Sequence, residues 1–273
     1  KYYDPAPWLQ GDAFDAVMNY RWYRPTRSFF AGATPALTAS RYAAALDSLN
    51  AGIAPPALRA MMNLTASHDA PRFSTDLYNP GRYKYRANPR EDPGYRIDRP
   101  DERTRRLQQL ILVQQFSGVG APHIWNGDEV GMWGADDPDE RKPVVWADLR
   151  YDDEVVHPFG RPRHRDAVAP DTALFRVYRE LIAVRTQQLR LFVDGTLAWL
   201  LRDDAHGLLA YERVLGDQRA IVVFNASDAP HQVSVRAEGR YRLAFPAGDT
   251  VTASGGRLRA DLPPRAARVW LRD

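Results

Sequence analysis

Apolar residues recur along the first two thirds of the chain with two different periods, which predict strands alternating with helices. Short apolar runs at residues 14–20, 61–67 and 122–125 are predicted to be strands. Helical spacing predicts helices at residues 39–46, 57–61, 101–116 and 172–191, and residues 28–33 are expected to open another. Thr38 or Ser40 would supply the N-cap of the helix at 39–46. This alternation is typical of an α/β fold.

One long segment, residues 73–100, interrupts this alternation and shows little periodicity. It carries four tyrosines among prolines, glycines and arginines: Tyr78, Tyr83, Tyr85 and Tyr95. Loops of this length in a compact domain are usually functional or disordered. The tyrosines could stack on sugar rings, or the segment could be a surface loop that packs on itself, and the sequence leaves both interpretations open.

The pattern changes after Asp194 and Gly195. Short alternating runs separated by Gly, Asp and Pro follow, at residues 197–201, 208–214, 220–225, 231–235, 241–245 and 267–271. Such spacing predicts a small antiparallel β domain over residues 194–273. We therefore expect two domains, with a boundary between residues 193 and 194.

Composition narrows the class of protein only moderately. The chain has 273 residues, of which 44% are hydrophobic, and it contains no cysteine, so disulfides and a Cys nucleophile are excluded. No run of 18 apolar residues predicts a membrane span. The pI is about 9.1, but the formal charge is only +3 and acidic residues are interleaved with the arginines. Without a binding motif, this charge does not favour a nucleic-acid partner.

The first candidate for chemistry is the string Ser67-His68-Asp69, where the strand predicted at 61–67 ends and Pro71 forces a turn. An imidazole and a carboxylate at the C-terminal end of a strand occupy the place where α/β barrels carry their active sites. A turn or a helix cap is the alternative interpretation of the same string.

Two stretches further along the chain contain more candidates. Residues 120–131 include Gly127-Asp128-Glu129 and Gly131, and residues 136–146 begin Asp-Asp-Pro-Asp-Glu-Arg. Asp137 and Arg141 have the i, i+4 spacing of an ordinary surface ion pair. The alternating carboxylates at positions 136, 137 and 139 would also suit calcium, although the full twelve-residue calcium-loop pattern is absent.

These three stretches together resemble the α-amylase family of glycoside hydrolases. Within it they resemble the branch of neopullulanases, cyclomaltodextrinases and periplasmic starch-degrading amylases. In that family a strand ending in His-Asp is the seventh of a (β/α)8 barrel, and Gly-Asp-Glu-x-Gly follows the eighth. The resemblance runs from about Pro5 to the C-terminus. It implies three βα units of such a barrel, strands six to eight, over residues 1–193, and a C-terminal β-sandwich over residues 194–273.

The resemblance implies roles for individual side chains. Asp69 would stabilise the transition state, and His68 would bond a hydroxyl of the same sugar. Asp137 and Arg141 would hold a glucose unit beside the cleaved bond, which we prefer to the calcium interpretation. Substrate contacts are also predicted for Tyr20 and Arg72. Arg72 could instead buttress Asp69 or anchor the loop, and Asp128 and Glu129 would organise their own loop.

Retaining glycoside hydrolysis needs two further carboxyl groups, a nucleophile and a general acid. The family patterns that carry them do not occur in this chain, and the pattern of the general acid would lie just upstream of Lys1. We therefore expect the C-terminal part of a retaining hydrolase of α-1,4-glucans (maltooligosaccharides, cyclodextrins, pullulan or starch), inactive without the upstream part of the enzyme.

Alternatives to this function also follow from the sequence. A glucan-binding or regulatory fragment without catalysis is the main one, and a nucleic-acid-binding protein is a weaker one. No redox cofactor is expected, and calcium is left open. The expected partners are the α-glucan and the upstream segment, without nucleic acid or membrane. Oligomeric state and compartment, periplasmic or cytoplasmic in a bacterium, are left open.

Overall fold

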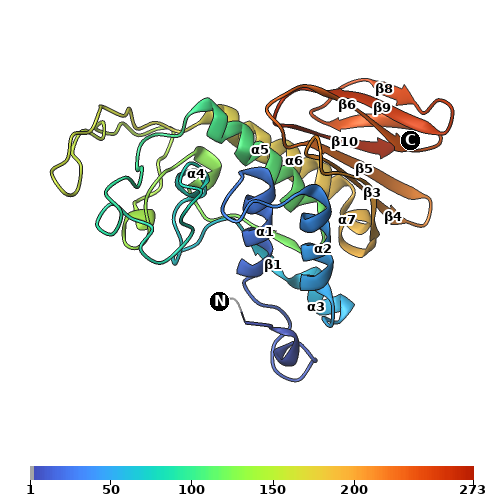
Figure 1. The fold of residues 1–273 in the computed structure, drawn as a ribbon, viewed down its shortest axis with the longest axis horizontal. Coiled ribbons are helices and arrows are strands. Elements are labelled where there is room, and N and C mark those ends of the chain that lie inside the picture. The colour runs from blue at the N-terminus through green and yellow to red at the C-terminus, as the bar shows by residue number, and fades with distance from the viewer. Residues whose placement is uncertain (1–2) are drawn as a thin grey trace. The chain divides into compact units, whose positions relative to one another are not determined.

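The computed structural model describes residues 3–273, which form two compact units by their internal contacts (Figure 1). The first unit comprises Lys1–Asn63, Gln109–Pro122 and Arg179–Asp273. The second comprises Leu64–Gln108 and His123–Tyr178. Each unit combines segments that are distant in sequence. The domain boundary expected between residues 193 and 194 separates two contiguous segments, whereas these units are not contiguous in sequence. That boundary therefore stays a prediction.

The first helix of the first unit, α1 (Tyr20–Phe30), begins earlier than the sequence predicted. The strand expected at residues 14–20 is reduced to a parallel bridge between Met18 and Met62, and the helix expected to open at 28–33 has already ended at Phe30. The reason lies in the aromatic residues of this segment, which recur at helical spacing and are buried along one helix: Trp22, Tyr23, Phe29 and Phe30.

A short 3-10 turn, η1 (Ala6–Trp8), precedes α1. The two helices that follow α1 occur where the sequence predicted them. Helix α2 (Ala39–Asn50) is capped by Thr38, whose Oγ1 accepts a hydrogen bond from the Arg41 N–H at 3.4 Å. Helix α3 (Pro55–Ala60) starts with two prolines, which are tolerated in a first helical turn because its N–H groups have no partner within the helix.

Two short strands lie at the centre of the chain, within the segments predicted as the second and third strands. They are β1 (Met62–Leu64) and β2 (Ala121–His123), and they form a two-stranded sheet. The Met62 N–H donates to the Val17 carbonyl at 3.2 Å, and the Asn19 N–H donates to the Met62 carbonyl at 2.8 Å. Residues 17–19 therefore run beside β1 in parallel, as the bridge of Met18 to Met62 requires.

The C-terminal segment of the first unit is an antiparallel β-sandwich, as predicted. Its larger sheet has six strands in the order β3 (Thr196–Asp203), β4 (Leu208–Leu215), β5 (Gln218–Asn225), β10 (Ala266–Arg272), β7 (Arg240–Phe245) and β8 (Thr250–Thr252). The smaller sheet pairs β6 (His231–Arg236) with β9 (Arg257–Leu262). Alternate residues of both sheets share one core, which contains Ile221, Val223, Val233, Val235, Leu258 and Trp270. Strands β8 and β9 were not predicted.

Two buried arginines tie the end of helix α5 (Glu102–Ser117) to its neighbours in the first unit. Arg213, on β4, is fully buried and donates to five carbonyl oxygens: those of Ser117, Gly118, Phe192 and Gly195 at 2.7–2.9 Å, and that of Thr196 at 3.4 Å. Arg185, on α6 (Thr172–Gln187), donates to the carbonyls of Phe116 and Gly120. The last carbonyl groups of a helix have no N–H partner within the helix, and at the end of α5 the two guanidinium groups donate to them instead. Burial lowers the pKa of Arg213 to about 10.

The second unit contains few regular elements of its own. They are α4 (Phe73–Leu77), η2 (Asp128–Val130) and η3 (Asp139–Arg141), joined by long loops. In the segment 73–100, Tyr83 and Tyr95 are buried, and the Tyr78 hydroxyl donates to the Asp98 carbonyl. Only Tyr85 of the four tyrosines has a mostly exposed ring. The segment therefore packs largely on itself, and Tyr85 alone of the four is free to stack on a ligand.

Among residues 3–273, no helix is both long enough and apolar enough to cross a lipid bilayer. The last helix, α7 (Leu189–Asp194), leads directly into β3, so the change of pattern predicted near residue 194 is a change from helix to strand.

We expect Arg213→Met to lower the free energy of unfolding by about 3 kcal/mol, because it leaves buried carbonyls without a donor. Equilibrium unfolding in urea would measure this loss. Arg236→Met, which changes an exposed arginine on β6, is the matched control and should stay within about 0.5 kcal/mol of the wild type. A similar small effect of both substitutions would contradict the role given to Arg213.

Candidate active site

A tight turn after β1 presents His68 and Asp69. The Ala70 N–H donates to the Ser67 carbonyl at 3.2 Å, and the Asp69 N–H donates to Ser67 Oγ at 3.0 Å. Ser67 is buried, whereas 52% of the His68 side chain and 34% of the Asp69 side chain are exposed. The His68 Nε2 lies 3.7 Å from Asp69 Oδ1. The backbone thus forms the turn that one interpretation predicted, and it also brings the imidazole and the carboxylate together at an accessible position.

Arg72 lies three residues after Asp69 and is only 1% exposed. Its Nη1 donates to the Asn126 carbonyl at 2.6 Å and lies 3.3 Å from Asp128 Oδ1, and its guanidinium lies over the Trp125 ring. A side chain buried to this degree cannot contact a substrate. The structure therefore corrects the substrate-binding assignment of Arg72 and supports the alternative, an anchor between the turn after β1 and the loop after β2.

The loop after β2 is organised by its own two carboxylates, as the sequence predicted. Asp128 is buried against Arg72, and Glu129 Oε2 accepts a hydrogen bond from the Gly127 N–H at 2.7 Å. Burial raises the pKa of Asp128 to about 7, although the neighbouring Arg72 guanidinium acts in the opposite direction. Gly127 has a φ of +98°, and a Cβ there would lie 2.4 Å from Met132 Sδ, so this position requires glycine.

Arg141, in the segment that contains Asp137, contacts the turn after β1. Its Nε lies 3.0 Å from Asp137 Oδ1 and 3.2 Å from Glu140 Oε1, and its Nη2 donates to the His68 carbonyl at 2.7 Å. The i, i+4 ion pair expected on spacing is therefore present. Both Asp137 and Arg141 remain about half exposed, beside His68, where a ligand could reach them.

Lys84, in the segment 73–100, is a neighbour of Asp69 that the sequence did not reveal. Its Nζ lies 4.0 Å from Asp69 Oδ2 and also donates to the Asp69 carbonyl. The contact joins positions fifteen residues apart through an irregular loop, so no periodicity predicted it. Its only signal in the sequence is composition, because Lys84 is one of three lysines in a chain whose other basic residues are arginines.

Three tryptophans that could serve as sugar platforms, and the predicted contact Tyr20, differ in their exposure. Trp125 is partly exposed, and its ring centroid lies 6.1 Å from that of His68. Trp133 is buried and donates to Glu154, which makes it a core residue, whereas Trp146 is 60% exposed. Tyr20 is the first residue of α1, in the first unit, and is 5% exposed. Its predicted contact with substrate stays a prediction.

The three carboxylates considered for calcium are occupied by donors of the protein. Asp136 accepts backbone N–H groups of Asp137 and Tyr85, and burial raises its pKa. Asp137 pairs with Arg141, and Asp139 accepts the Ala135 N–H at 2.7 Å and lies 3.5 Å from Lys142 Nζ. Calcium prefers carboxylates free to bind it through several oxygens. Each of the three carboxylates already has a donor of the protein as a partner.

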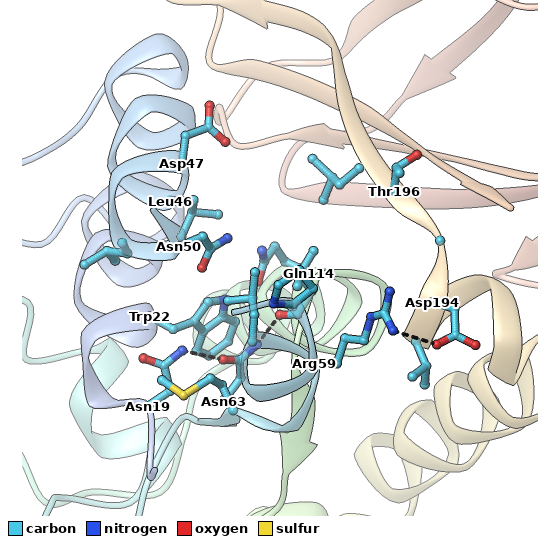
Figure 2. A pocket seen from close by; sticks show the side chains of 18 of the residues that line it. Asn19, Trp22, Leu46, Asp47, Asn50, Arg59, Asn63, Gln114, Asp194 and Thr196 are labelled. Carbon is cyan, nitrogen blue, oxygen red and sulfur yellow. Dashed lines mark hydrogen bonds and ion pairs between the residues drawn. The ribbon is translucent and has the colours of Figure 1, made fainter. Parts of the chain in front are cut away.

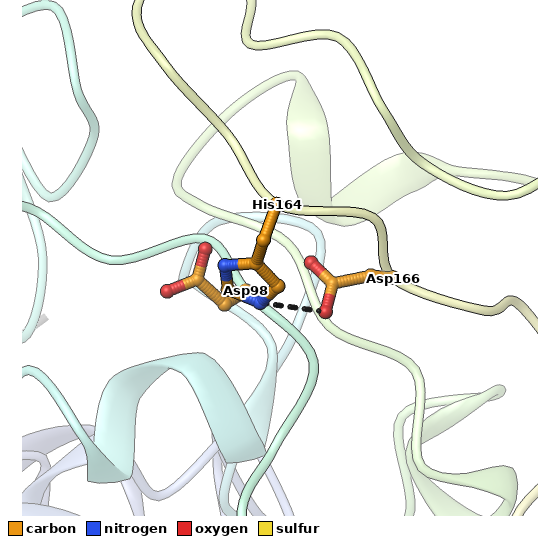
Figure 3. A group of neighbouring side chains, drawn as sticks. All are labelled: Asp98, His164 and Asp166. Carbon is orange, nitrogen blue, oxygen red and sulfur yellow. Dashed lines mark ion pairs between the residues drawn. The ribbon is translucent and has the colours of Figure 1, made fainter.

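A second group of metal-ligand types lies elsewhere in the second unit, where His164 and Asp166 approach Asp98 (Figure 3). His164 Nε2 is 3.0 Å from Asp166 Oδ1, and Asp166 also lies 3.1 Å from Arg163 Nη2. Asp98 lies 3.4 Å from Arg96 Nε. Because both carboxylates are paired with arginines, the group is explained as an ion-pair network.

A cavity of about 460 Å³ lies in the first unit, between α1, α2, α3 and the start of β3 (Figure 2). Two of the amides that line it are bonded to each other: Asn19 Nδ2 donates to Asn63 Oδ1 at 2.8 Å, and Asn63 Nδ2 donates to the Val119 carbonyl at 2.7 Å. At its rim Arg59 pairs with Asp194 at 3.3 Å. This lining holds a network of amides and ion pairs but not the His-Asp pair, so the second unit remains the site of interest.

Comparison with known proteins agrees with these motifs. The family described as Maltogenic Amylase, C-terminal domain, matches residues 199–269, within the β-sandwich. The chain is 28% identical over 265 residues to a cyclomaltodextrinase of Geobacillus thermopakistaniensis, and 29% identical over 266 residues to neopullulanase 2 of Thermoactinomyces vulgaris. Each alignment covers 96% of this chain. The chain is therefore similar to enzymes of the α-amylase family.

The match is to the C-terminal part of these α-amylase-family enzymes. The chain spans 37% and 38% of the length of the two relatives, so it corresponds to little more than a third of each. A solved cyclomaltodextrinase structure, 25% identical, superimposes with a TM-score of 0.72 over 100% of this chain and 39% of that one. The relatives are glycoside hydrolases of the α-amylase family.

We expect Arg72→Met to lower the free energy of unfolding by about 3 kcal/mol, because it leaves Asp128 buried without its cation. The raised pKa of Asp128, about 7, means that the folded protein binds a proton that the unfolded chain has lost above about pH 4. Stability should therefore fall between about pH 4 and pH 7 in the wild type. In Arg72→Met, where the pKa of Asp128 would be higher still, the fall should continue above pH 7.

Urea unfolding at pH 6 and pH 8 would measure both effects of Arg72→Met. Arg82→Met is the matched control, because Arg82 forms an exposed ion pair with Asp92. A loss of stability that is equal at the two pH values would contradict the coupling of Arg72 to Asp128.

Proposed function

We propose that this chain is the C-terminal part of a retaining glycoside hydrolase of α-1,4-glucans, and that Asp69 stabilises the transition state. The observation that carries the proposal is the cluster around Asp69. A partly exposed carboxylate lies at the end of a strand, between His68 and Lys84, with Arg141 bonded to the adjacent backbone. An accessible carboxylate between two basic side chains can bind sugar hydroxyls and favour a positively charged ring.

Retaining hydrolysis also requires a nucleophile and a general acid about 5 Å apart, which we assign to a segment upstream of this chain. The nucleophile would attack the anomeric carbon while the acid protonates the departing oxygen, and water would then release the sugar. In this scheme Asp69 carries no proton and forms no covalent bond. Its negative charge, together with a hydrogen bond from His68, stabilises the sugar ring while positive charge develops on it.

We infer that residues 17–19, β1 and β2 are adjacent strands of a (β/α)8 barrel that the upstream segment completes. Three features support this: the parallel bridge of Met18 to Met62, the pairing of β1 with β2, and the helices that follow each strand. Parallel strands at the edge of an incomplete sheet leave backbone groups unpaired. The assembled protein would therefore include the missing strands on the same or another chain.

The names of the relatives suggest cyclodextrins and pullulan, besides maltooligosaccharides and starch, as the first substrates to test. Arg141 and Asp137 would bind one glucose unit beside the cleaved bond. Their partial exposure and the bond from Arg141 to the His68 carbonyl support this assignment, because substrate bound there would lie next to Asp69.

We expect Asp69→Asn to lower kcat for maltotriose about a thousand-fold in the assembled enzyme, because the neutral amide no longer stabilises the positively charged ring. Initial rates of hydrolysis would measure this, and the melting temperature should stay close to that of the wild type. Asp217→Asn, in the exposed turn between β4 and β5, is the matched control and should retain full activity.

Two outcomes would count against the proposal. An Asp69→Asn enzyme within tenfold of the wild-type rate would remove Asp69 from the catalytic machinery. An assembled wild-type protein that binds maltotriose without cleaving it would instead favour a glucan-binding protein that has no hydrolytic activity.

A further inference from the structure

Lys84 occupies an unusual position for a lysine. Its side chain is only 5% exposed, although it belongs to an irregular loop at the surface of the second unit. Lysines are rarely buried to this degree unless a carboxylate compensates the charge. Two carboxylates face this ammonium: Asp69, with 4.0 Å between Nζ and Oδ2, and Asp136, whose pKa the Lys84 charge lowers against the effect of burial. Nζ also donates to the Asp69 carbonyl.

The backbone that follows Lys84 is held in a conformation that non-glycine residues seldom adopt. Tyr85 and Arg86 have φ angles of +54° and +64°, in the left-handed region. A residue with a Cβ is strained in this region and persists there only when its surroundings enforce the conformation. The surroundings here enforce a sharp change of chain direction immediately after the lysine.

Asp136 provides that enforcement from the loop after β2. Its carboxylate accepts the Tyr85 N–H, and its own N–H donates to the Ala87 carbonyl at 3.0 Å. Ala87 also belongs to a small buried cluster, together with Tyr95, Ile97 and Ala135. Two loops that are distant in sequence thus clamp the strained residues and fix the direction in which the Lys84 side chain leaves the backbone.

We propose that Lys84 is a positioning residue that holds the Asp69 carboxylate in its working orientation. The inference rests on the proposed function of Asp69. Two groups flank that carboxylate, His68 at 3.7 Å from Oδ1 and Lys84 at 4.0 Å from Oδ2, so each oxygen has a different basic neighbour. The ammonium restricts the rotation of the carboxylate. An exposed ion pair would do little, but Lys84 is shielded from water, which strengthens its field.

The same clamp leaves the Tyr85 ring 64% exposed, with Lys84 Nζ 5.4 Å from the ring centroid. The ammonium therefore lies between the Asp69 backbone and an aromatic face, which further limits its mobility. The segment 73–100 contributes to the active site through Lys84 by this account, whereas its other tyrosines serve to pack the loop.

The test compares three variants of the assembled enzyme. Lys84→Met keeps the length of the buried side chain and removes its charge. It should lower kcat for maltotriose by about ten- to a hundred-fold and change KM by less than about threefold, because it acts on transition-state stabilisation. Lys84→Arg should recover part of the loss. Arg86→Met removes a 74% exposed cation two residues away and should leave kcat within about twofold.

A second measurement separates positioning from general damage to the loop. In the Asp69→Asn background, Lys84→Met should lower the remaining kcat for maltotriose by less than about twofold, because its target is gone. An equal loss in the Asp69→Asn background and in the otherwise wild-type enzyme would overturn the proposal. So would a Lys84→Met enzyme with the same kcat as Arg86→Met.

A third measurement needs no substrate and therefore separates this inference from the proposed function. The Asp69 carboxyl can be titrated through its side-chain carbon resonance, and its midpoint should move upward in Lys84→Met and return in Lys84→Arg. An unchanged midpoint overturns the role of Lys84 even in an active enzyme. Absence of glucan hydrolysis by the wild type contradicts the proposed function but leaves this titration decisive for Lys84.

Discussion

The geometry of the candidate site depends on the buried contact between Arg72 and Asp128. It joins the turn that carries His68 and Asp69 to the loop that follows β2, two segments more than fifty residues apart. A buried ion pair contributes little stability by itself, but each partner is expensive to leave uncompensated, so the two segments must fold together or not at all. The accessible residues of the site can remain polar because this buried contact holds the two segments together.

Irregular loops of the second unit contribute further contacts to the candidate site. Arg141 reaches the His68 carbonyl, and Asp136 clamps the strained residues that direct Lys84 toward Asp69. Each contact is made by a loop without regular secondary structure. In this chain a short strand thus leads into the turn that carries His68 and Asp69, and loop residues place further charged groups beside it.

The sequence predicted those parts of the fold in which local pattern and tertiary packing agree. The Thr38-capped helix α2 and the alternating strands β4 and β5 are of this kind. Helix α1 was misassigned because a short apolar run before Tyr20 has no periodicity that distinguishes a strand from the entry to a helix. Strand β8 was missed because all three of its residues are exposed, so no buried face marks it.

The candidate site was predictable where motifs carry it and unpredictable where only packing does. His68, Asp69, Asp137 and Arg141 were found from the motifs of their segments, whereas the buried role of Arg72 and the approach of Lys84 depend on distances that no local pattern encodes.

The most direct test of this account is a crystal structure of the assembled protein with a bound maltooligosaccharide. We predict hydroxyl groups of one sugar unit within hydrogen-bond distance of the Asp69 carboxylate and the His68 ring. A sugar bound elsewhere, with Asp69 and His68 contacting only protein, would contradict it.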